Sequence, residues 1–351
     1  HQINFFLFCL GLIFFYKLIK LRYNNVFYSF LSIILIILSP RIFGESFYNT
    51  RDIFFMSLFI IYIYFGYNFL QKRNITNIII FSFFTALLLN TKILGIIPIF
   101  FYIILYIYSF LNTQKKLSKE KNIVFLFFFF TTISIYILWP YLWNNPILNL
   151  YIAFKNILEI HESLVVINFY FGKYVESDMM PWHYRLVWFL ITTPLIVIFL
   201  FLIGAIFQFI NTRNILNKTL KRDINMETNQ FYDLYLFLCL LLSFLIISEF
   251  NVSKFGGWRH LYFLYPIIIY LAISGLNYLK YKFSNLNFLV INLLIFINLS
   301  YNIFWILKNH PNQYLYFNNF NKNYLVKNFD LDWWGISHKT ALEHILKNDN
   351  S

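Results

Sequence analysis

The chain has 351 residues, of which 60% are hydrophobic and 12% are charged. A soluble domain carries about 25% charged residues, so the composition excludes an ordinary soluble domain and predicts an all-α polytopic membrane protein. The net charge of +13 does not predict a nucleic-acid partner, because the charge of membrane-protein loops follows their topology. The partner that the composition predicts is the lipid bilayer.

The apolar runs predict about ten transmembrane helices, because a spanning helix needs about 20 apolar residues. Only Asn90-Thr91-Lys92 separates the fourth run from the fifth, so these two are expected to form a tight hairpin or to include a short tilted helix. In chain order the predicted helices are 3–19, 25–40, 53–70, 75–90, 93–111, 122–141, 186–210, 231–249, 260–277 and 286–306.

Lys and Arg residues divide the short loops into a strongly basic set and a set with few basic residues. The positive-inside rule places the basic set in the cytoplasm. The unusual polar segments all fall on the opposite, non-cytoplasmic side. The basic set comprises the segments 17–22, 72–73, 115–121, 213–222 and 280–282.

The segment Ser39–Asp52, SPRIFGESFYNTRD, is the most polar stretch between two apolar runs. Charge at the mouth of a hydrophobic bundle is costly, so this concentration indicates a polar functional site. The alternative is a solvated loop with arginines at the membrane boundary. The polar side chains of this segment that are predicted to form the site are Arg41, Glu45, Tyr48, Asn49, Arg51 and Asp52.

The segment 142–185 is predicted to be a long non-cytoplasmic loop. Within it, residues 147–168 have an amphipathic pattern, which is typical of a helix that lies in the membrane interface. Residues 169–185 mix charged and aromatic side chains and include His183. No second metal ligand stands at a telling distance from His183, so no metal site is predicted there.

The segment 250–266, FNVSKFGGWRHLYFLYP, forms another polar stretch on the same side. The glycine pair 256–257 permits a tight turn, and Trp258, Arg259 and His260 follow at the mouth of the next helix. A guanidinium group suits phosphate because it donates to two oxygens at once. The alternative is an arginine that extends to the membrane interface.

Residues 307–351 form a predicted non-cytoplasmic tail, separate from the transmembrane domain 1–306. The pattern of Ser337 to Leu346 predicts a short amphipathic helix capped by Ser337. Aromatic and polar residues of the tail are expected to cover the mouth of the bundle.

The order and spacing of eight segments resemble integral-membrane glycosyltransferases of the GT-C superfamily, in particular the bacterial proteins related to family 39, the protein O-mannosyltransferase-like enzymes. The resemblance covers nearly the whole chain. The segments that carry it are SPRIFGESFYNTRDIFF (39–55), LLLNTKILGI (87–96), LWPYLWNNP (138–146), FGKYV (171–175), PWHYRLVWFLITTP (181–194), GGWRHLYFLYP (256–266), HPNQYLYFN (310–318) and LDWWGISHKTALE (331–343).

The resemblance implies a sugar donor linked to polyprenyl or dolichyl phosphate, and a protein or glycan acceptor on the non-cytoplasmic face. The transfer would invert the anomeric carbon, as in a hexosyl- or mannosyltransferase of the bacterial inner (cytoplasmic) membrane. No cofactor is firmly implied. A divalent metal is compatible with such a reaction, but the sequence does not support one.

In this family the catalytic base is an acidic residue in the first non-cytoplasmic loop, after the first helix. The chain resembles the family from its second helix onward, so we expect that loop to be missing, which would leave the chain on its own inactive. The family's second acidic position is matched by Asp52, which is the predicted catalytic residue.

The cations on the non-cytoplasmic side are the predicted ligands of the donor phosphate, because a departing phosphate needs positive charge beside it. Arg41, Lys92 and Arg259 are expected to approach one cavity together with Asp52, below the 142–185 segment. The predicted phosphate ligands are Arg41, Arg51, Lys92 and Arg259, and the further predicted substrate contacts are Glu45, Tyr48, Asn49, His183, Trp258 and His260.

A transporter or flippase of lipid-linked sugars is the alternative function. Transporters place ionisable residues at mid-membrane depth, whereas nearly all charges of this chain lie in loops or at the ends of predicted helices. This distribution favours an enzyme that works at the membrane boundary.

Overall fold

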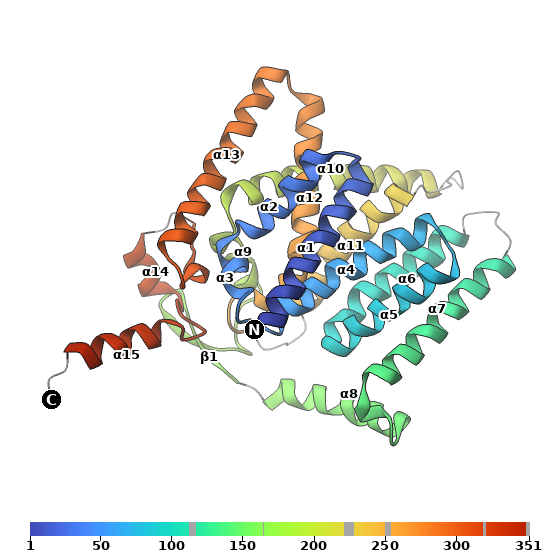
Figure 1. Ribbon diagram of the computed structural model, residues 1–351, viewed down its shortest axis with the longest axis horizontal. Helices are drawn as coiled ribbons and strands as arrows, with labels where there is room; N and C mark the ends of the chain where they lie inside the picture. Colours follow the sequence, from blue (N-terminus) through green and yellow to red (C-terminus); the bar gives the residue numbers. More distant parts are fainter. Residues whose placement is uncertain (112–116, 164, 221–227, 250–253, 319–320, 349–351) are drawn as a thin grey trace.

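The computed structural model describes residues 1–351 except 112–116, 164, 221–227, 250–253, 319–320 and 349–351 (Figure 1). The structure is mostly helical (79%), as the predicted all-α class requires. Within the described residues, seven helices are long and apolar enough to cross a membrane. Three of the ten predicted spans are shorter apolar helices, namely Val26–Ile37, Ile75–Thr91 and Ile93–Tyr108. The chain thus has the helices of a multi-pass membrane protein.

Asparagine residues set the helix boundaries in the first part of the chain. Asn24 closes the first helix in a left-handed conformation (φ 47°), which asparagine tolerates better than most residues. Asn25 and Asn74 cap the helices that begin at Val26 and Ile75, by accepting hydrogen bonds from Tyr28 N and Asn77 N, respectively. The elements are α1 (Gln2–Tyr23), α2 (Val26–Ile37), α3 (Pro40–Glu45), α4 (Asp52–Gln71), α5 (Ile75–Thr91), the 3-10 turn η1 (Ile93–Gly95), α6 (Ile96–Leu111) and α7 (Leu117–Leu138).

The second part of the chain adds the remaining helices and one small hairpin. Two basic loops predicted to be cytoplasmic lie partly outside the described residues, at 112–116 and 221–227. The elements are η2 (Pro140–Leu142), α8 (Pro146–Ser163), β1 (Ile167–Tyr170), β2 (Lys173–Glu176), α9 (Tyr184–Thr192), α10 (Leu195–Leu220), α11 (Thr228–Glu249), η3 (Arg259–Leu264), α12 (Tyr265–Lys282), α13 (Asn285–Lys308), η4 (Gln313–Leu315), α14 (Lys322–Asn328) and α15 (Ser337–Asn348).

The helix predicted over 186–210 was wrong as a single element, because it is divided at Pro194 into α9 and α10. Proline lacks an N–H group and forces the preceding residue out of the helical conformation. Thr193 is accordingly extended (φ −102°, ψ 137°). The chain therefore changes direction in the middle of an apolar run that looks continuous in the sequence.

The amphipathic helix predicted over 147–168 ends earlier, at Ser163, and an unpredicted antiparallel hairpin follows it. Its two-residue turn consists of Phe171 and Gly172, which both have positive φ (49° and 75°). Such turns match the twist of the two strands, but they normally contain Asn or Gly at the first position. The unusual Phe171 explains why the sequence pattern did not reveal the turn.

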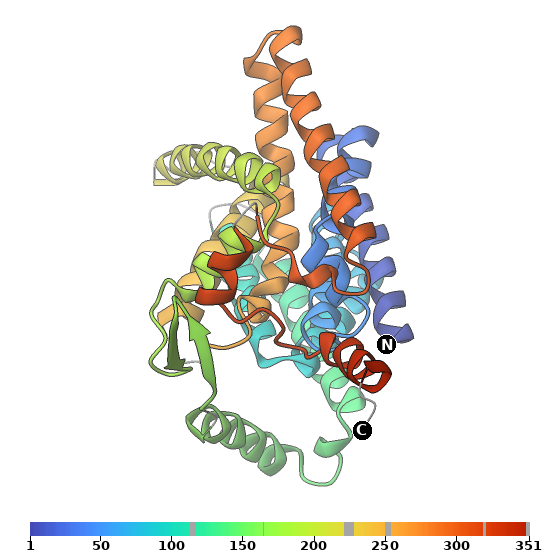
Figure 2. The ribbon, with the colours of Figure 1, turned by 90° about the vertical axis from the view of Figure 1, so that its left-hand side faces the viewer.

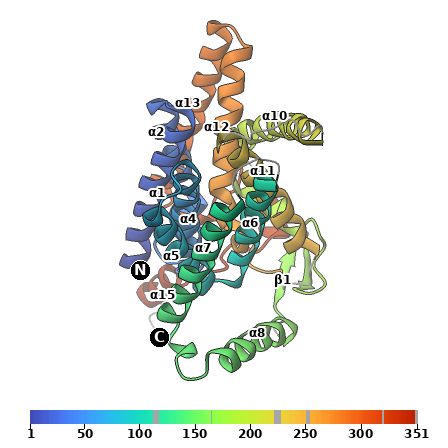
Figure 3. The ribbon, with the colours of Figure 1, turned by 90° about the vertical axis from the view of Figure 1, so that its right-hand side faces the viewer.

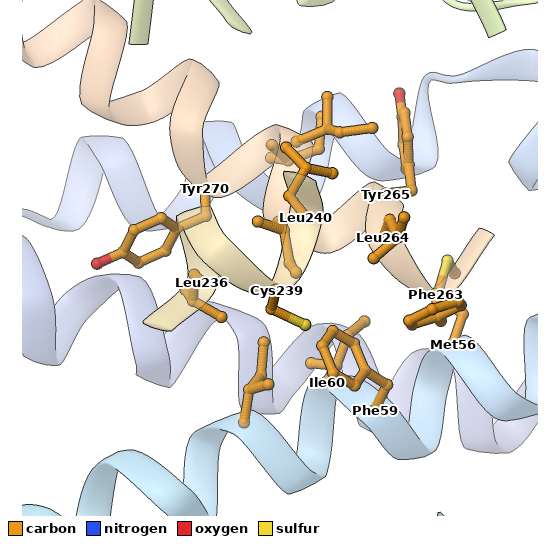
Figure 4. Close-up of a cluster of buried hydrophobic side chains, with 14 of the residues drawn as sticks. Met56, Phe59, Ile60, Leu236, Cys239, Leu240, Phe263, Leu264, Tyr265 and Tyr270 are labelled. Carbon is orange, nitrogen blue, oxygen red and sulfur yellow. The ribbon is translucent and has the colours of Figure 1, made fainter. Parts of the chain in front are cut away.

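The centre of the bundle is made by α4, α11 and α12. The window of the α12 span is 89% buried and that of α4 is 78% buried, whereas those of α7 and α13 are each only 17% buried. Figure 4 shows side chains of α4 meeting those of α11 and η3, with Phe59 and Ile60 close to Cys239. The free thiol of Cys239 is thus a small buried core group. The outward apolar faces of α7 and α13 are typical of helices in contact with lipid.

Two glycines allow α10 and α12 to cross with their backbones in contact. A Cβ atom on Gly204 would lie 1.8 Å from the backbone oxygen of Leu271, and one on Gly275 would lie 2.3 Å from that of Leu200. Small residues at such crossings are typical of membrane helix pairs. In Figures 2 and 3, α10 accordingly lies across α12 while α13 runs beside α12.

The hairpin, α8, α15 and the N-terminus lie in the lower half of Figure 1. The tail is joined to the hairpin there: Phe169 N donates to the carboxylate of Asp330 at 2.8 Å, and Asp330 N donates to Phe169 O at 3.2 Å. The helix predicted from Ser337 is present as α15. The predicted capping by Ser337 was wrong, because Ser337 is the first residue of α15. The N-terminus of this helix is held by Asp332, which accepts from the backbone N–H groups of Ile336 and Ser337 and from the Ser337 hydroxyl.

Candidate functional site

Asp52 is the first residue of α4 and lies at the centre of a group of polar side chains. Asn49 fixes it in two ways: its Oδ1 accepts from Asp52 N at 2.9 Å, and its Nδ2 donates to Asp52 Oδ2 at 3.0 Å. The Asp52 residue is only 3% exposed. An acid at a helix N-terminus is favoured by the helix dipole, so the local sequence NTRD places a charged carboxylate at the mouth of the bundle.

Three cationic or titratable side chains from two other elements surround this carboxylate. Lys92, just after α5, forms an ion pair with Asp52 Oδ1. Arg259 and His260, at the start of η3, place Nε at 3.9 Å and Nδ1 at 3.7 Å from its two oxygens. We call Asp52, Lys92, Arg259 and His260 the charged cluster. Positions 52, 92 and 259, which the sequence predicted to approach one another, are brought together.

Glu45, at the end of α3, extends the polar network away from the charged cluster. Asn49 Nδ2 also donates to Glu45 Oε2 at 2.7 Å, and the Tyr262 hydroxyl donates to Glu45 Oε1 at 2.6 Å. Burial raises the pKa of the Glu45 carboxyl, against the opposing effect of Arg41. One amide nitrogen therefore links two buried carboxyl groups.

Arg41 lies near this network but not in the charged cluster. It is 6% exposed, and its guanidinium packs over the rings of Trp188 and Phe317, at 5.2 and 5.8 Å from their centroids. Among the described residues no carboxylate lies within 4 Å of it, and its Nε has no hydrogen-bond partner. Arg41 lines a small pocket beside Glu45, so the single cavity predicted from the sequence is two adjoining sites.

The tail covers Arg259, as its aromatic residues suggested. The guanidinium carbon lies 5.1, 5.4 and 5.0 Å from the ring centroids of Phe255, Trp333 and Trp334. Gly256, with φ 64°, permits this arrangement, because a Cβ there would lie 2.8 Å from Arg259 Nε. Arg259 Nε is buried and has no hydrogen-bond partner within the described chain. Its capacity to donate is therefore not used up by the protein.

A cavity of about 580 Å³ opens beside Lys92. We call it the apolar cavity, because most of its lining is hydrophobic. The only charged lining residue in the described structure is Lys92, and the amide of Asn90 contributes two buried polar atoms that lack partners there. Its wall comes from the ends of α5 and α7, the start of α6, η2 and α8, and includes Leu89, Ile96, Ile135, Trp139, Leu150 and Phe154.

Four predicted site residues lie elsewhere. Arg51 is exposed and makes no ion pair within the part of the chain that the structure describes. His183 contacts the rings of Tyr170 and Trp182 instead of the charged cluster. Trp258 is 3% exposed and donates from Nε1 to Thr192 Oγ1 at 2.9 Å, which makes it a packing residue. Tyr48 makes edge-to-face contacts with the rings of Tyr314 and Trp334.

The sequence reasoning missed four residues that contact the site. Tyr262 could not be singled out, because it is one of 27 tyrosines and its only signal is its place three positions after Arg259. Trp333 and Trp334 are conspicuous in the sequence as a tryptophan pair in a polar tail, but the sequence does not show which part of the bundle they contact. The place of Asp330 in the site could be predicted only if its pairing with the hairpin were known.

No group of three or more His, Cys, Asp or Glu side chains that could hold a metal ion occurs among the residues described. The donor set of the charged cluster also opposes a metal, since Lys92 and Arg259 already occupy the surroundings of the Asp52 carboxylate. Comparisons of the chain with protein-family models, with curated proteins and with solved structures found no match.

Proposed function

We propose that the protein is a membrane glycosyltransferase that moves a sugar from a polyprenyl-phosphate donor to an acceptor on the non-cytoplasmic side. The observation that carries the proposal is the position of Lys92. Its side chain pairs with Asp52 in the charged cluster and also lines the apolar cavity. A ligand that joins a phosphate to a long hydrocarbon chain needs both environments side by side.

The apolar cavity suits the hydrocarbon part of such a donor. Its lining is apolar and aromatic, and its volume of about 580 Å³ falls in the range of ligand sites, roughly 300–1,000 Å³. Isoprene units entering it would exchange lipid surroundings for similar protein surroundings. The phosphate would then lie near Lys92, at the polar end of the cavity.

The charged cluster suits the phosphate and its departure. When the bond between the sugar and the phosphate oxygen breaks, negative charge increases on the phosphate, and fixed cations stabilise that charge. Arg259 and Lys92 supply two cations for one carboxylate, so the cluster keeps a net positive charge. Asp52 then acts by positioning both cations, while His260 lies within 4 Å of the same carboxylate.

The positions of the remaining charges favour transfer over transport. In the described part of the chain, the ion pairs Arg22–Asp233 and Arg73–Glu120 lie near helix ends or in a connection between helices, and not at the middle of a span. A transporter of charged lipids would need ionisable groups along its path. A site at one end of the bundle is the arrangement expected of an enzyme.

The test uses a polyprenyl-phosphate sugar with a photoreactive group in its isoprene chain, in proteoliposomes that contain the protein. Crosslinks are expected on α5, α7 and α8, with competition by unlabelled polyprenyl phosphate. Crosslinks that follow the lipid-facing side of α13 instead would contradict the assignment. A label that crosses the vesicle membrane with its sugar–phosphate bond intact, without transfer to any acceptor, would support the flippase alternative.

A further inference from the structure

The pocket beside Glu45 has a composition unlike that of the charged cluster or the apolar cavity. Its volume is about 10 Å³, enough for a single water molecule. It is lined by one guanidinium (Arg41), two carboxyl groups (Glu45 and Asp330) and the indole rings of Trp188, Trp333 and Trp334. We call it the aromatic pocket. Neither Asp52 nor Lys92 is among its lining residues.

We propose that the aromatic pocket is the acceptor subsite and that it binds a carbohydrate, through its hydroxyl groups and the face of one sugar ring. This inference rests on the proposed transferase function. It goes beyond that function by naming the chemical class of the acceptor and the residues that select it.

The two carboxyl groups provide unused hydrogen-bond acceptors. A carboxylate has about four acceptor positions. Glu45 accepts from Tyr262 and Asn49, and Asp330 accepts from Phe169 N. Burial raises the pKa of both carboxyl groups, against the opposing effect of these hydrogen bonds. A ligand with several hydroxyl donors would satisfy the remaining positions.

Arg41 supplies the complementary donors. Its buried Nε has no partner among the described residues, and a buried donor without a partner is unfavourable. An anionic ligand would pair with Arg41 but would meet the two carboxyl groups in the same small volume. A neutral ligand whose oxygens both donate and accept fits all three groups.

The indole rings of Trp188, Trp333 and Trp334 complete the lining of the aromatic pocket. They offer flat apolar faces, and a sugar ring presents an apolar face of C–H groups between its hydroxyls. Aromatic side chains with a few placed polar groups are the usual lining of small-molecule sites. A serine or threonine side chain of a peptide has one hydroxyl and no such face, so it would use little of this pocket.

The pocket is connected to the site of the proposed reaction. Asn49 bridges Glu45 and Asp52 with contacts of 2.7 and 3.0 Å, so an acceptor held by Glu45 would lie next to the charged cluster. The outer wall is Trp333 and Trp334, which come from the tail and also cover Arg259. A sugar would enter by displacing these indoles, since the present volume holds only one water.

The experiment measures binding without any donor. The purified chain in lipid nanodiscs is titrated with the methyl glycosides of mannose, glucose, galactose and N-acetylglucosamine, and with a threonine-containing peptide, and its tryptophan fluorescence is followed. At least one glycoside is expected to give a saturable change, with a dissociation constant on the order of 1 mM, which is typical of a small ligand with few contacts. The peptide is expected to give none.

Two variants test the lining independently, so a folding defect in one leaves the other informative. Glu45→Gln and Asp330→Asn are each expected to weaken glycoside binding about 5-fold, the effect of losing one hydrogen bond. The matched control is Asp178→Asn, an exposed acid outside the pocket, which should leave binding unchanged. Trp334→Leu should reduce both the affinity and the fluorescence change.

Three binding results would overturn the inference, as would the kinetic result given below: no saturable change with any glycoside, equal binding by the Glu45→Gln, Asp330→Asn and control variants, or binding of the peptide alone. These results are separate from the fate of the transferase proposal. Glycoside binding that depends on Glu45 and Asp330 would stand even if no polyprenyl-phosphate donor were bound. Transfer with an acceptor KM that is unaffected in both variants would remove the subsite and leave the transferase.

Discussion

The side chain of Asn49 binds both the backbone and the carboxylate of Asp52: its oxygen accepts from Asp52 N at 2.9 Å and its nitrogen donates to Asp52 Oδ2 at 3.0 Å. The same nitrogen donates to Glu45 at 2.7 Å. Asn49 therefore determines both where α4 begins and where the carboxylate of the charged cluster lies. Only an amide can do this, because both an acceptor and a donor are required on one short side chain.

Replacing Asn49 by Ala should lower the free energy of unfolding by about 2 kcal/mol, through loss of the hydrogen bond from Asp52 N and of a hydrogen bond to a charged group. It should also weaken donor binding, because Asp52 is released. The matched control is Asn74→Ala at the start of α5, where Asn74 caps Asn77 N at 2.9 Å. That variant should lose about 1 kcal/mol of stability and keep donor binding. Thermal unfolding in nanodiscs, with and without polyprenyl phosphate, measures the stability and the donor binding of each variant. Equal effects of the two variants on donor binding would contradict the role of Asn49.

The ion pair between Lys92 and Asp52 should show strong energetic coupling. Asp52 has a side chain only 4% exposed, and removing one partner of a buried pair leaves a charge uncompensated, at a cost of about 3 kcal/mol. Asp52→Asn and Lys92→Met should therefore each destabilise the protein, and the double variant should lose less than the sum of the two. The pair Arg73–Glu120, at 2.7 Å, is the control: breaking it should leave donor binding unchanged. Additive losses at Asp52 and Lys92 would show that the pair is not coupled.

Stability should fall as the pH rises through the titration range of Glu45. Burial raises the pKa of this carboxyl above its ordinary value of 4.5, so the folded protein binds the proton more tightly than the unfolded chain does. The stabilising contribution is complete below pH 4.5 and is lost as the pH rises to the folded pKa. Arg41, Tyr262 and Asp52 act on the same carboxyl. Glu45→Gln should make the unfolding temperature less dependent on pH in this range, and Asp178→Asn should not; an unchanged pH profile in Glu45→Gln would refute the prediction.

The crossing of α10 and α12 should not tolerate even one added methyl group at Gly204. A Cβ there would lie 1.8 Å from a backbone oxygen, so the helices must move apart and lose dispersion contacts along the crossing. Gly204→Ala should reduce the yield of folded protein or its unfolding temperature severely. Gly11→Ala, whose Cβ would lie 3.3 Å from Ser57, should have a smaller effect. Size-exclusion profiles and thermal unfolding of the two variants test this, and equal behaviour would contradict the crossing.

Local composition was enough to predict most of the fold but not its breaks. The apolar runs marked the helices because the hydrophobicity of a run is a property of its own residues and does not depend on tertiary contacts. Pro194 was visible in the sequence, yet the length of the run around it concealed its effect. The hairpin turn at Phe171 depends on a positive φ that a bulky residue adopts only when tertiary contacts hold it, so no local pattern could predict it.

The candidate site was predictable only in its charges. Lys92 and Arg259 stood out because charge is rare in this chain and costly near the membrane. Their partner Asp52 lies 40 residues from Lys92, a pairing that only the folded bundle defines. Tyr262, Asp330 and the Trp333–Trp334 pair join the site through side-chain packing, which periodicity does not encode. Arg51 shows the converse, because it is the immediate neighbour of the buried Asp52 in the sequence and is nevertheless exposed.

The affinity of the protein for polyprenyl phosphate, measured in nanodiscs for four versions of the chain, tests the central claim most directly. Arg259→Ala should bind about 10- to 150-fold more weakly, the effect of losing a charged hydrogen bond worth about 1.5–3 kcal/mol. Arg259→Lys should be intermediate, because it keeps the charge but loses the planar fork of donors. The exposed arginine of the same polar face provides the control, and Arg51→Ala should bind as the parent does. Equal affinity of Arg259→Ala and the parent, with normal membrane insertion, would contradict the assignment of the charged cluster as a phosphate site.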